Sequence, residues 1–520
     1  MRVSLRARRL LVAVLCVAVP LLSAVGAGRA NAHAVLLRSS PAQNARLQMG
    51  PAAVQLFFSE ALDRHGSSIR VLDSSGAAVH SGGASFTADP TEMDLALPPL
   101  QPGFFEVSWT TVSAVDGHRL QGSFPFVLLN PDGSTPSGAE AAVSAPALDP
   151  APPPFDSAVR AVLLLALMAL AGGGAFALFV LLPAAVEAGA DDGPTPWPPA
   201  VGRAARLLVW AGAIVAVASL IGVWREAGQL GGPGHLLEAV QARVGWLALG
   251  RIAAALVAAA LAWRLQRGAE RARWRWWGAW IAALVALATM SLASHAAARS
   301  GAGWAVPADF VHLLSASVWV GGLLQLPWLL RDTRGNVQPR PAAVASALGR
   351  FSSLAALSVA ALILTGLFSA TVEVASPRNL GGTNYGITLI VKAALAGALF
   401  LVALVNAVWL APRVRRTLLT SAGRPNGSAV TLLRRTILAE AALGVAVVCV
   451  TGVLVWLVPA RDAAAGKLAR LQPGANASSV YRNSAPAGDL TVALTITPNR
   501  PGENELRAQL GGPDVQDVSR

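Results

Sequence analysis

Eight apolar segments, each long enough to cross the hydrocarbon core of a bilayer, most constrain how this chain can fold. Because 54% of the 520 residues are hydrophobic, the sequence predicts a multi-pass α-helical membrane bundle with soluble parts. The expected spans are 158–182, 207–224, 244–263, 277–294, 307–330, 351–370, 388–410 and 437–458.

Basic residues are distributed unequally between the loops that join these segments. If the chain before the first span lies outside, the inner loops hold 17 arginines and the outer loops hold 4. The positive-inside rule predicts such an excess. We therefore attribute the net charge of +13 to membrane topology rather than to nucleic-acid binding. The protein is expected in the cytoplasmic membrane, with its N-terminal domain and C-terminal tail outside.

Residues 1–32 have the layout of a secretory signal peptide: a basic start, an apolar run and the cleavage motif Arg29-Ala30-Asn31-Ala32. Cleavage after Ala32 would make His33 the first residue. An N-terminal histidine offers its α-amine and its ring Nδ1 to one metal ion. Cleavage one residue away would remove the amine ligand.

Residues 33–130 are predicted to form an exported all-β sandwich of the immunoglobulin or cupredoxin kind. Alternating apolar residues between Gly, Pro, Asp and Ser turns indicate strands at 53–60, 68–72, 93–97, 104–112 and 123–129. Neither cysteine lies in this domain, which excludes a disulfide or a thiol metal site there.

The rest of the chain divides by composition into three parts. Residues 131–156 are rich in Pro and Ala and indicate a linker. The membrane domain is expected at 157–460. Residues 461–520 are expected to form an extracytoplasmic tail with a partial β segment, in which a strand at 490–498 turns at 500–504 and pairs with 505–510.

The sequence Asp116-Gly117-His118 places a carboxylate and an imidazole two residues apart, on one face if this segment is a strand. Together with His33 they offer an amine, two imidazoles and a carboxylate, a set that suits Cu(II). Asp-Gly alone is also a common turn. The two features together, in an exported domain, favour a copper site at His33, Asp116 and His118.

Several polar residues lie at the expected outer ends of membrane helices. His295 ends the fourth span, and Asp309 and His312 share one face at the start of the fifth. Arg251 and Lys392 are charges within the outer half of the membrane, where they require partners or water. We expect His295, Asp309 and His312 to form a metal path with Arg251 or Lys392 as charge partners. Alternatively, Asp309 caps its helix and the two cations reach the headgroups.

One further acidic residue, Glu440, lies near the inner end of the last span. We expect it to form a structural ion pair with Arg434 or Arg435.

These motifs resemble those of a known pair of copper-resistance families. The residues His33-Ala-Val-Leu, Ser40-Pro41, Phe57-Phe-Ser-Glu60, Trp109, Asp116-Gly-His118 and Gly122-Ser-Phe-Pro-Phe126 resemble the CopC domain. The membrane part is similar to its partner CopD in Gly250-Arg251, Ser294-His295, Asp309-x-x-His312, Trp319-Val-Gly-Gly322, Thr365-Gly366, Thr383-Asn-Tyr-Gly386, Lys392 and Asn406. The whole resembles a CopC–CopD copper-resistance or copper-uptake fusion of the YcnJ type.

The resemblance implies a Cu(II) site made by His33, Asp116 and His118, and it implies copper as the ligand that the protein carries. It leaves no counterpart for the Met-rich Cu(I) patch of some members, since only Met49 and Met93 lie in the domain. The segment from about 488 resembles the start of a small β domain that follows CopD in some fusions.

The function expected from these features is extracytoplasmic Cu(II) capture and transfer to the membrane domain for import. The alternative is copper resistance by sequestration, or copper delivery without translocation. We expect no enzyme, because a copper monooxygenase often uses an axial tyrosine and both tyrosines lie outside the β domain. A di-haem bundle would need paired histidines inside helices, and no nucleotide motif supports ATP-driven pumping. Expected partners are the copper ion, the lipid bilayer and an unidentified extracytoplasmic copper chaperone, with no nucleic acid.

Overall fold

The computed structural model describes residues 34–64, 66–80, 83–114, 119–136, 154–187, 198–229, 232–266, 273–294, 302–332, 341–374, 376–420, 427–457, 459–460, 481–487, 490–497 and 505–511. These residues fall into two compact units, one rich in β-strands and one helical, which are taken separately below. The expected signal peptide lies outside the described residues.

The first unit contains the predicted β-sandwich, built from two four-stranded sheets. One sheet has the order β1-β3-β6-β5 and the other the order β2-β8-β7-β4. The bounds are β1 Leu36–Ser40, β2 Arg46–Leu47, β3 Ala53–Phe58, β4 Ser68–Asp73, β5 Ser85–Phe86, β6 Glu92–Ala96, β7 Gly103–Val112 and β8 Arg119–Leu128. The five predicted strands are present as β3, β4, β6, β7 and β8. The sequence pattern missed β1, β2 and β5, two of which have only two residues.

Buried and less buried side chains alternate along β3 of the sandwich, as its sequence pattern predicts. Val54, Leu56 and Phe58 point inward and are buried. Trp109 in β7 lies directly opposite Gly122 in β8, and a Cβ at Gly122 would overlap the indole ring. Trp109 also contacts Phe58 of the other sheet edge to face, with ring centroids 5.4 Å apart. Glycine at position 122 therefore makes the room in which the tryptophan joins the two sheets.

The tail contains one strand more than expected. Strands β9 Tyr481–Ala487, β10 Leu490–Thr497 and β11 Glu505–Gly511 form an antiparallel sheet in the order β11-β10-β9. The predicted pairing of 490–498 with 505–510 is confirmed. The third strand, β9, was missed because its sequence, YRNSAPA, has no apolar alternation and contains a proline.

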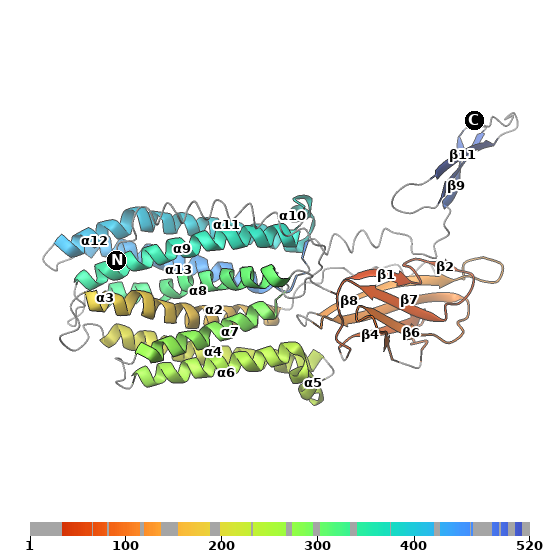
Figure 1. Cartoon of the computed structure of the whole chain (residues 1–520). Helices are drawn as coiled ribbons and strands as arrows, with labels where there is room; N and C mark the ends of the chain where they lie inside the picture. The colour runs from red at the N-terminus through yellow and green to blue at the C-terminus, as the bar shows by residue number, and fades with distance from the viewer. Residues whose placement is uncertain are drawn as a thin grey trace. The chain divides into compact units, whose positions relative to one another are not determined.

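The helical unit is a bundle of long helices lying side by side (Figure 1). The helices are α2 Pro154–Phe176, which continues through η1 Ala177–Leu181 into α3 Leu182–Glu187; α4 Pro198–Gln229; η3 Pro233–His235 and α5 Leu236–Gln241; α6 Arg243–Gln266; α7 Arg273–Leu292; α8 Ala302–Asp332; α9 Pro341–Val374; α10 Arg378–Gly382; α11 Asn384–Val405, which continues through η4 Asn406–Leu410 into α12 Ala411–Thr420; and α13 Gly427–Leu454. Within the described residues, 8 helical segments are long and apolar enough to cross a membrane, as predicted.

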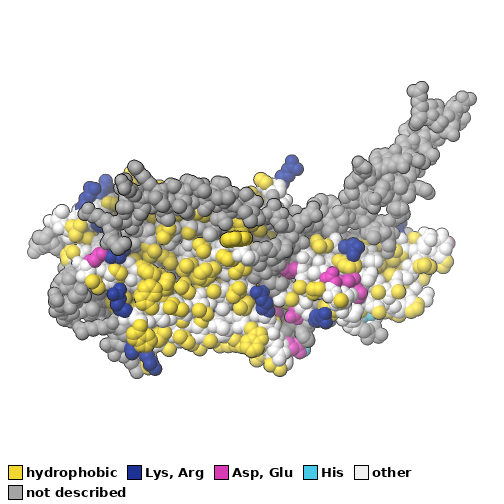
Figure 2. All heavy atoms as spheres, in the orientation of Figure 1, with side chains coloured by type: hydrophobic (Ala, Val, Ile, Leu, Met, Phe, Trp, Pro, Cys, Tyr) yellow, Lys and Arg dark blue, Asp and Glu magenta, His cyan; other side chains and the backbone are white. Residues whose placement is uncertain are grey.

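The flank of this bundle has the surface of a lipid-facing protein. Figure 2 shows hydrophobic side chains covering the helices between their two ends, with Lys and Arg gathered near the ends. Among the described residues, seven of the nine exposed tryptophans lie close to helix ends, where indole rings favour the level of the headgroups. They are Trp224, Trp246, Trp263, Trp274, Trp277, Trp304 and Trp328.

Helix α2 is the centre of the bundle and packs against α4, α7, α8 and α13. Its tightest crossing is with α8, where a Cβ at Gly172 would overlap the Ser317 carbonyl and a Cβ at Gly321 would lie 2.6 Å from the Met168 carbonyl oxygen. The next residue, Gly322, leaves room for the ring of Phe351 in α9. Small residues of this kind let helix backbones approach closely in a membrane.

We therefore expect Gly172→Ala to destabilise the helical unit. The added methyl group must separate α2 from α8, and overpacking of this kind costs about 1–3 kcal/mol. Thermal unfolding of the full chain in detergent measures the effect as a lower Tm. Gly222→Ala in α4 is the matched control, because a Cβ there meets no atom within 4 Å. Equal melting of Gly172→Ala and the wild type would contradict the proposed crossing.

Candidate metal centre

The first described residues of the β-sandwich are fastened to the end of strand β7. The Thr111 hydroxyl donates to the Ala34 carbonyl oxygen at 3.3 Å, and the Val35 amide donates to Ser59 Oγ at 2.9 Å. Ala34 is only 1% exposed. The described chain therefore begins at this edge of the sandwich.

The loop that carries the second predicted motif starts and ends at the same edge. Val112 in β7 pairs with Arg119 in β8, so residues 113–118 connect the two strands. The Ala114 amide donates to the Ala61 carbonyl oxygen at 3.0 Å, which fixes the start of the loop. The neighbouring Glu60 is a buried carboxylate.

The three predicted ligands themselves, His33, Asp116 and His118, lie outside the described residues. Their assignment as ligands stays a prediction. What the described residues provide is the position of the flanking chain: Ala34 is bonded to Thr111, one residue from the pair that closes the loop.

In the helical unit, His312 of α8 faces α9. Its Nδ1 lies 2.9 Å from Thr365 Oγ1, and the Thr365 hydroxyl lies 2.6 Å from the Ala361 carbonyl oxygen. A hydroxyl has one proton, which Thr365 donates to Ala361, so its oxygen accepts from His312 Nδ1–H. This assigns the ring proton to Nδ1 and leaves a lone pair on Nε2, the form in which histidine binds metals.

Lys392 of α11 completes this group, which we call the His312 cluster: Asp309, His312, Thr365 and Lys392. The lysine charge acts on both Asp309 and His312. Next to Thr365, Gly366 leaves space for the imidazole, since a Cβ there would lie 3.5 Å from His312 Cε1. Three helices, α8, α9 and α11, thus bring together a carboxylate, an imidazole, a hydroxyl and an ammonium group. His295, the remaining residue of the expected path, lies outside the described residues.

Arg251 belongs to a different part of the bundle. It is 4% exposed in α6, its Nε donates to Thr289 Oγ1 of α7 at 2.9 Å, and Arg160 of α2 is the charge that acts on it. None of its interactions with described residues involves Asp309 or His312. Of the two cations expected as partners, the structure therefore places Lys392 in the His312 cluster and Arg251 elsewhere. Arg251 points into the bundle and does not reach the headgroups.

The expected ion pair of Glu440 with Arg434 or Arg435 is wrong. Glu440 is 4% exposed, and its Oε2 accepts from Asn406 Nδ2 at 3.0 Å. The arginines precede it by five and six residues, a spacing that puts them on other faces of the helix. The sequence signal that points to the true partner is Asn406, because an amide side chain inside an apolar span needs a buried hydrogen-bond partner.

Comparison with known proteins places these sites in family domains. Residues 36–128 match the CopC domain, residues 154–306 match the Copper resistance protein D-like, N-terminal domain, and residues 345–454 match Copper resistance protein D. The chain is 29% identical to Copper transport protein CutJ of Bacillus subtilis (strain 168) over 92% of this chain and 82% of that protein. The chain thus combines CopC and CopD family domains in one sequence.

Other matches cover shorter parts of the chain. Copper resistance protein D of Pseudomonas syringae pv. tomato is 29% identical over 25% of this chain and 44% of that protein. The crystal structure of CopC from Methylosinus trichosporium OB3b is 34% identical and covers 18% of this chain and 93% of that chain, with a TM-score of 0.18.

The CopC and CopD matches frame the candidate site. Asp116 and His118 lie within the CopC match, and His33 precedes it. Thr365, Lys392, Asn406 and Glu440 lie within the CopD match. Among the described residues of this CopC–CopD chain, no group of three or more His, Cys, Asp or Glu is placed to hold a metal ion. The His312 cluster therefore offers two ligand groups of these kinds, Asp309 and His312.

We expect Asp309 and Lys392 to be coupled energetically. Asp309→Asn leaves the lysine charge without its carboxylate, and Lys392→Met does the reverse, so each single variant should lower the Tm. The double variant should lose less than the sum, with a coupling between the ~1 kcal/mol of exposed pairs and the ~3 kcal/mol of buried ones.

The control for this comparison of single and double variants is the ion pair of Glu187 and Arg350, which is partly exposed on the helical unit. Glu187→Gln, Arg350→Met and their combination should give the smaller coupling. Strictly additive effects of Asp309→Asn and Lys392→Met would show that the two charges do not form a pair.

Proposed function

We propose that this CopC–CopD chain captures Cu(II) outside the cytoplasmic membrane and passes it to its helical unit for import. The observation that carries the proposal is the presence of a CopC domain and CopD-type membrane segments in one chain, similar over 92% of its length to a copper transport protein. Copper is the cargo in this proposal. No catalysed reaction is proposed.

The capture site consists of the His33 amine and imidazole, the Asp116 carboxylate and the His118 imidazole. Nitrogen and oxygen donors of this kind suit Cu(II). The anchoring of Ala34 to Thr111 supports the proposal, because it brings the chain next to His33 to the edge where β7 and β8 are joined.

The orientation in the membrane follows from the signal peptide and the arginines. The end of the bundle at which α4, α7, α9 and α13 begin carries an excess of arginine, which favours the cytoplasmic side. The opposite end, which holds the His312 cluster, then faces outward and is where copper from the CopC domain would enter. An external copper chaperone remains an expectation of the same scheme.

Sequestration or delivery without translocation is the second candidate. The observation that favours it is the small number of ligands in the helical unit, where the described residues contain no three-ligand group. A protein that only holds copper needs the β-domain site alone. The two candidates differ in whether His312 is required for copper to cross.

The capture site makes a prediction about the N-terminus. The mature protein should begin at His33 and bind one Cu(II), and addition of one residue before His33 should weaken binding severely, because the amine–imidazole chelate is lost. The amine binds copper only without its proton, and its ordinary pKa is about 7.7–8.0. Affinity should therefore fall as the pH is lowered through and below this range, as measured by competition with a chelator.

Substitutions in the loop test the remaining ligands. His118→Ala should change the Cu(II) electron paramagnetic resonance spectrum, and Asp116→Ala should change it less because water can replace a carboxylate. His80→Ala, on the described part of the same domain, is the control. Equal affinity of the extended protein, or a larger spectral change in His80→Ala than in His118→Ala, would refute the ligand assignment.

The membrane step makes a separate prediction. His312→Ala should abolish copper accumulation in cells because it removes the Nε2 lone pair, while Cu(II) binding at the N-terminal site stays unchanged. Thr365→Val is the informative companion, since it removes the acceptor that holds the proton on Nδ1 and should reduce accumulation less. Normal accumulation in His312→Ala would favour sequestration over transport.

A further inference from the structure

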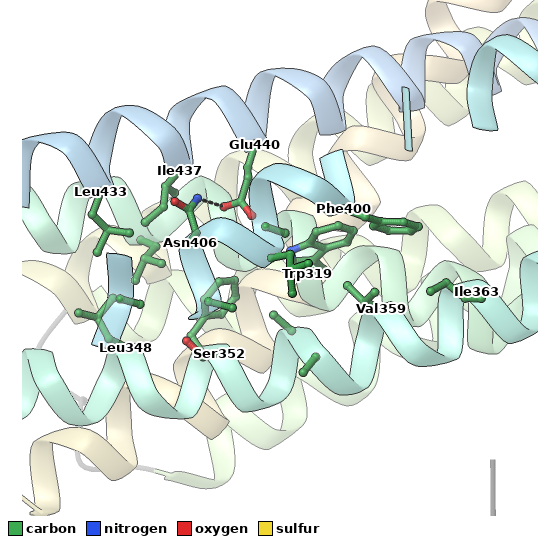
Figure 3. Close-up of a pocket in the computed structure, with 18 residues that line it drawn as sticks. Trp319, Leu348, Ser352, Val359, Ile363, Phe400, Asn406, Leu433, Ile437 and Glu440 are labelled. Atoms are coloured by element: carbon green, nitrogen blue, oxygen red, sulfur yellow. Dashed lines mark hydrogen bonds between the residues drawn. The ribbon is translucent and has the colours of Figure 1, made fainter. Parts of the chain in front are cut away.

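A cavity of about 360 Å³ opens between α8, α9, α11 and α13 and extends along α9 from Leu348 to Ile363, two residues before Thr365 of the His312 cluster. Figure 3 shows Asn406 and Glu440 facing each other across its wall, with Trp319 and Phe400 beside them. The two aromatic rings stack with centroids 5.4 Å apart. Nearly all other lining side chains are apolar, so the carboxyl group lies at the polar end of an apolar chamber.

The carboxyl group belongs to a short chain of hydrogen bonds. Thr436 Oγ1 donates to Asn406 Oδ1 at 2.6 Å, and Asn406 Nδ2 donates to Glu440 Oε2 at 3.0 Å. Asn406 begins the π-helical turn η4, where the regular helix is interrupted. Such turns occur frequently at functional sites, because they change the direction of a side chain.

Among the described residues, Asn406 is the only hydrogen-bond or ion-pair partner of Glu440. Every other side chain that lines the cavity is non-ionisable. An isolated charge in apolar surroundings costs several kcal/mol, and a bound proton or another cation removes that cost.

The charged groups on the packed helices have other surroundings. On α9, Arg350 pairs with Glu187, and on α12 the Arg415 guanidinium donates to the Ala345 carbonyl oxygen at 3.1 Å. On α8 and α11, Asp309, His312 and Lys392 form the His312 cluster. Among the residues of these helices whose side chains are described, the remaining ionisable ones do not line the cavity: Arg331 on α8, Glu373 on α9, Tyr385 on α11, Arg413 and Arg416 on α12, and Arg434, Arg435 and Cys449 on α13.

The side chains at this site suit a proton better than a copper ion. The site has one carboxylate, one amide and one hydroxyl, and no imidazole, thiol or thioether lines the cavity. Cu(I) prefers sulfur ligands, and imidazole is the common ligand for Cu(II). A carboxyl group in a hydrogen-bonded chain suits a proton.

We propose that Glu440 is a proton-binding site, at which the carboxylate takes up one proton and releases it again as the helical unit moves copper. Asn406 positions the carboxyl group and Thr436 holds Asn406. Lys392 and Asn406 are separated along α11 by ~21 Å at 1.5 Å per residue. The proton site and the His312 cluster are therefore two separate sites on one set of helices. The link to copper movement rests on the proposed function, whereas the binding of a proton does not.

The first test is infrared spectroscopy of the full chain in lipid as the pH is changed. The wild type should show a C=O stretching band of a protonated carboxyl that Glu440→Gln removes and Glu187→Gln keeps. Asn406→Ala should shift the frequency of that band because it removes the hydrogen bond. The proposal is overturned if the titration of Glu440→Gln is the same as that of the wild type. If Glu440→Gln does not fold, an unshifted spectrum in Asn406→Ala overturns it instead.

The second test is copper uptake into vesicles that contain the full chain and carry an imposed pH gradient. For each coupled proton, one pH unit should change the steady-state copper accumulation ratio by about tenfold in the wild type. Glu440→Gln should make accumulation independent of the gradient, and Glu187→Gln should respond as the wild type does. A gradient response retained by Glu440→Gln overturns the coupling. If the wild type imports no copper but the infrared band behaves as expected, the proposed function fails and the proton site stands.

Discussion

Close backbone contact at glycine is the constraint on which the helical unit depends. In lipid, apolar side chains gain little by moving from the bilayer to another helix, so packing must come from close fit. Gly172 and Gly321 bring α2 against α8, Gly452 brings α13 against α2, and Gly322 admits Phe351 of α9. The helices that carry His312, Thr365 and Glu440 are positioned by these contacts. The Trp-Val-Gly-Gly motif in α8 therefore has a packing role, which explains why two glycines follow Trp319.

Most polar groups inside the bundle lie in its two family-matched parts, whereas Asp309 and His312 lie on α8 between them. Arg251 and Thr289 lie within residues 154–306, whereas Thr365, Lys392, Asn406 and Glu440 lie within residues 345–454. Buried polar groups in a membrane are costly and need partners. Arg251 bonds to Thr289, and Asn406 bonds to Glu440, within the same part. Thr365 and Lys392 instead interact with His312 and Asp309 on α8. The CopD part thus holds most of the chemistry of the bundle, and α8 joins the two parts.

Features with a strong periodicity or length could be predicted from the sequence, and features made by tertiary contact could not. The eight spans follow from apolar length alone, and β3 and β7 follow from alternation. Two-residue strands such as Arg46–Leu47 carry no pattern and exist because β8 offers a free edge. Glu440 was assigned to an arginine because that partner was nearest in sequence, but helix geometry puts it opposite Asn406, 34 residues away. The hairpin edge that receives Ala34 depends on a side chain 77 residues away, which no local pattern reveals.

If the proposed capture site has more copper ligands than the His312 cluster, this difference would set the energetics of transfer. The capture site would supply an amine, two imidazoles and a carboxylate, whereas the described part of the His312 cluster supplies one imidazole and one carboxylate. Fewer donors bind copper more weakly, so movement from the first position to the second requires another source of free energy. Protonation of the His33 amine would weaken copper binding at the capture site. A proton taken up at Glu440, nearer the cytoplasmic end of the bundle in the proposed orientation, would supply further free energy for the transfer. In this scheme protons act at both ends of the route, and the copper affinity of the His312 cluster need only be high enough to receive the ion and low enough to release it.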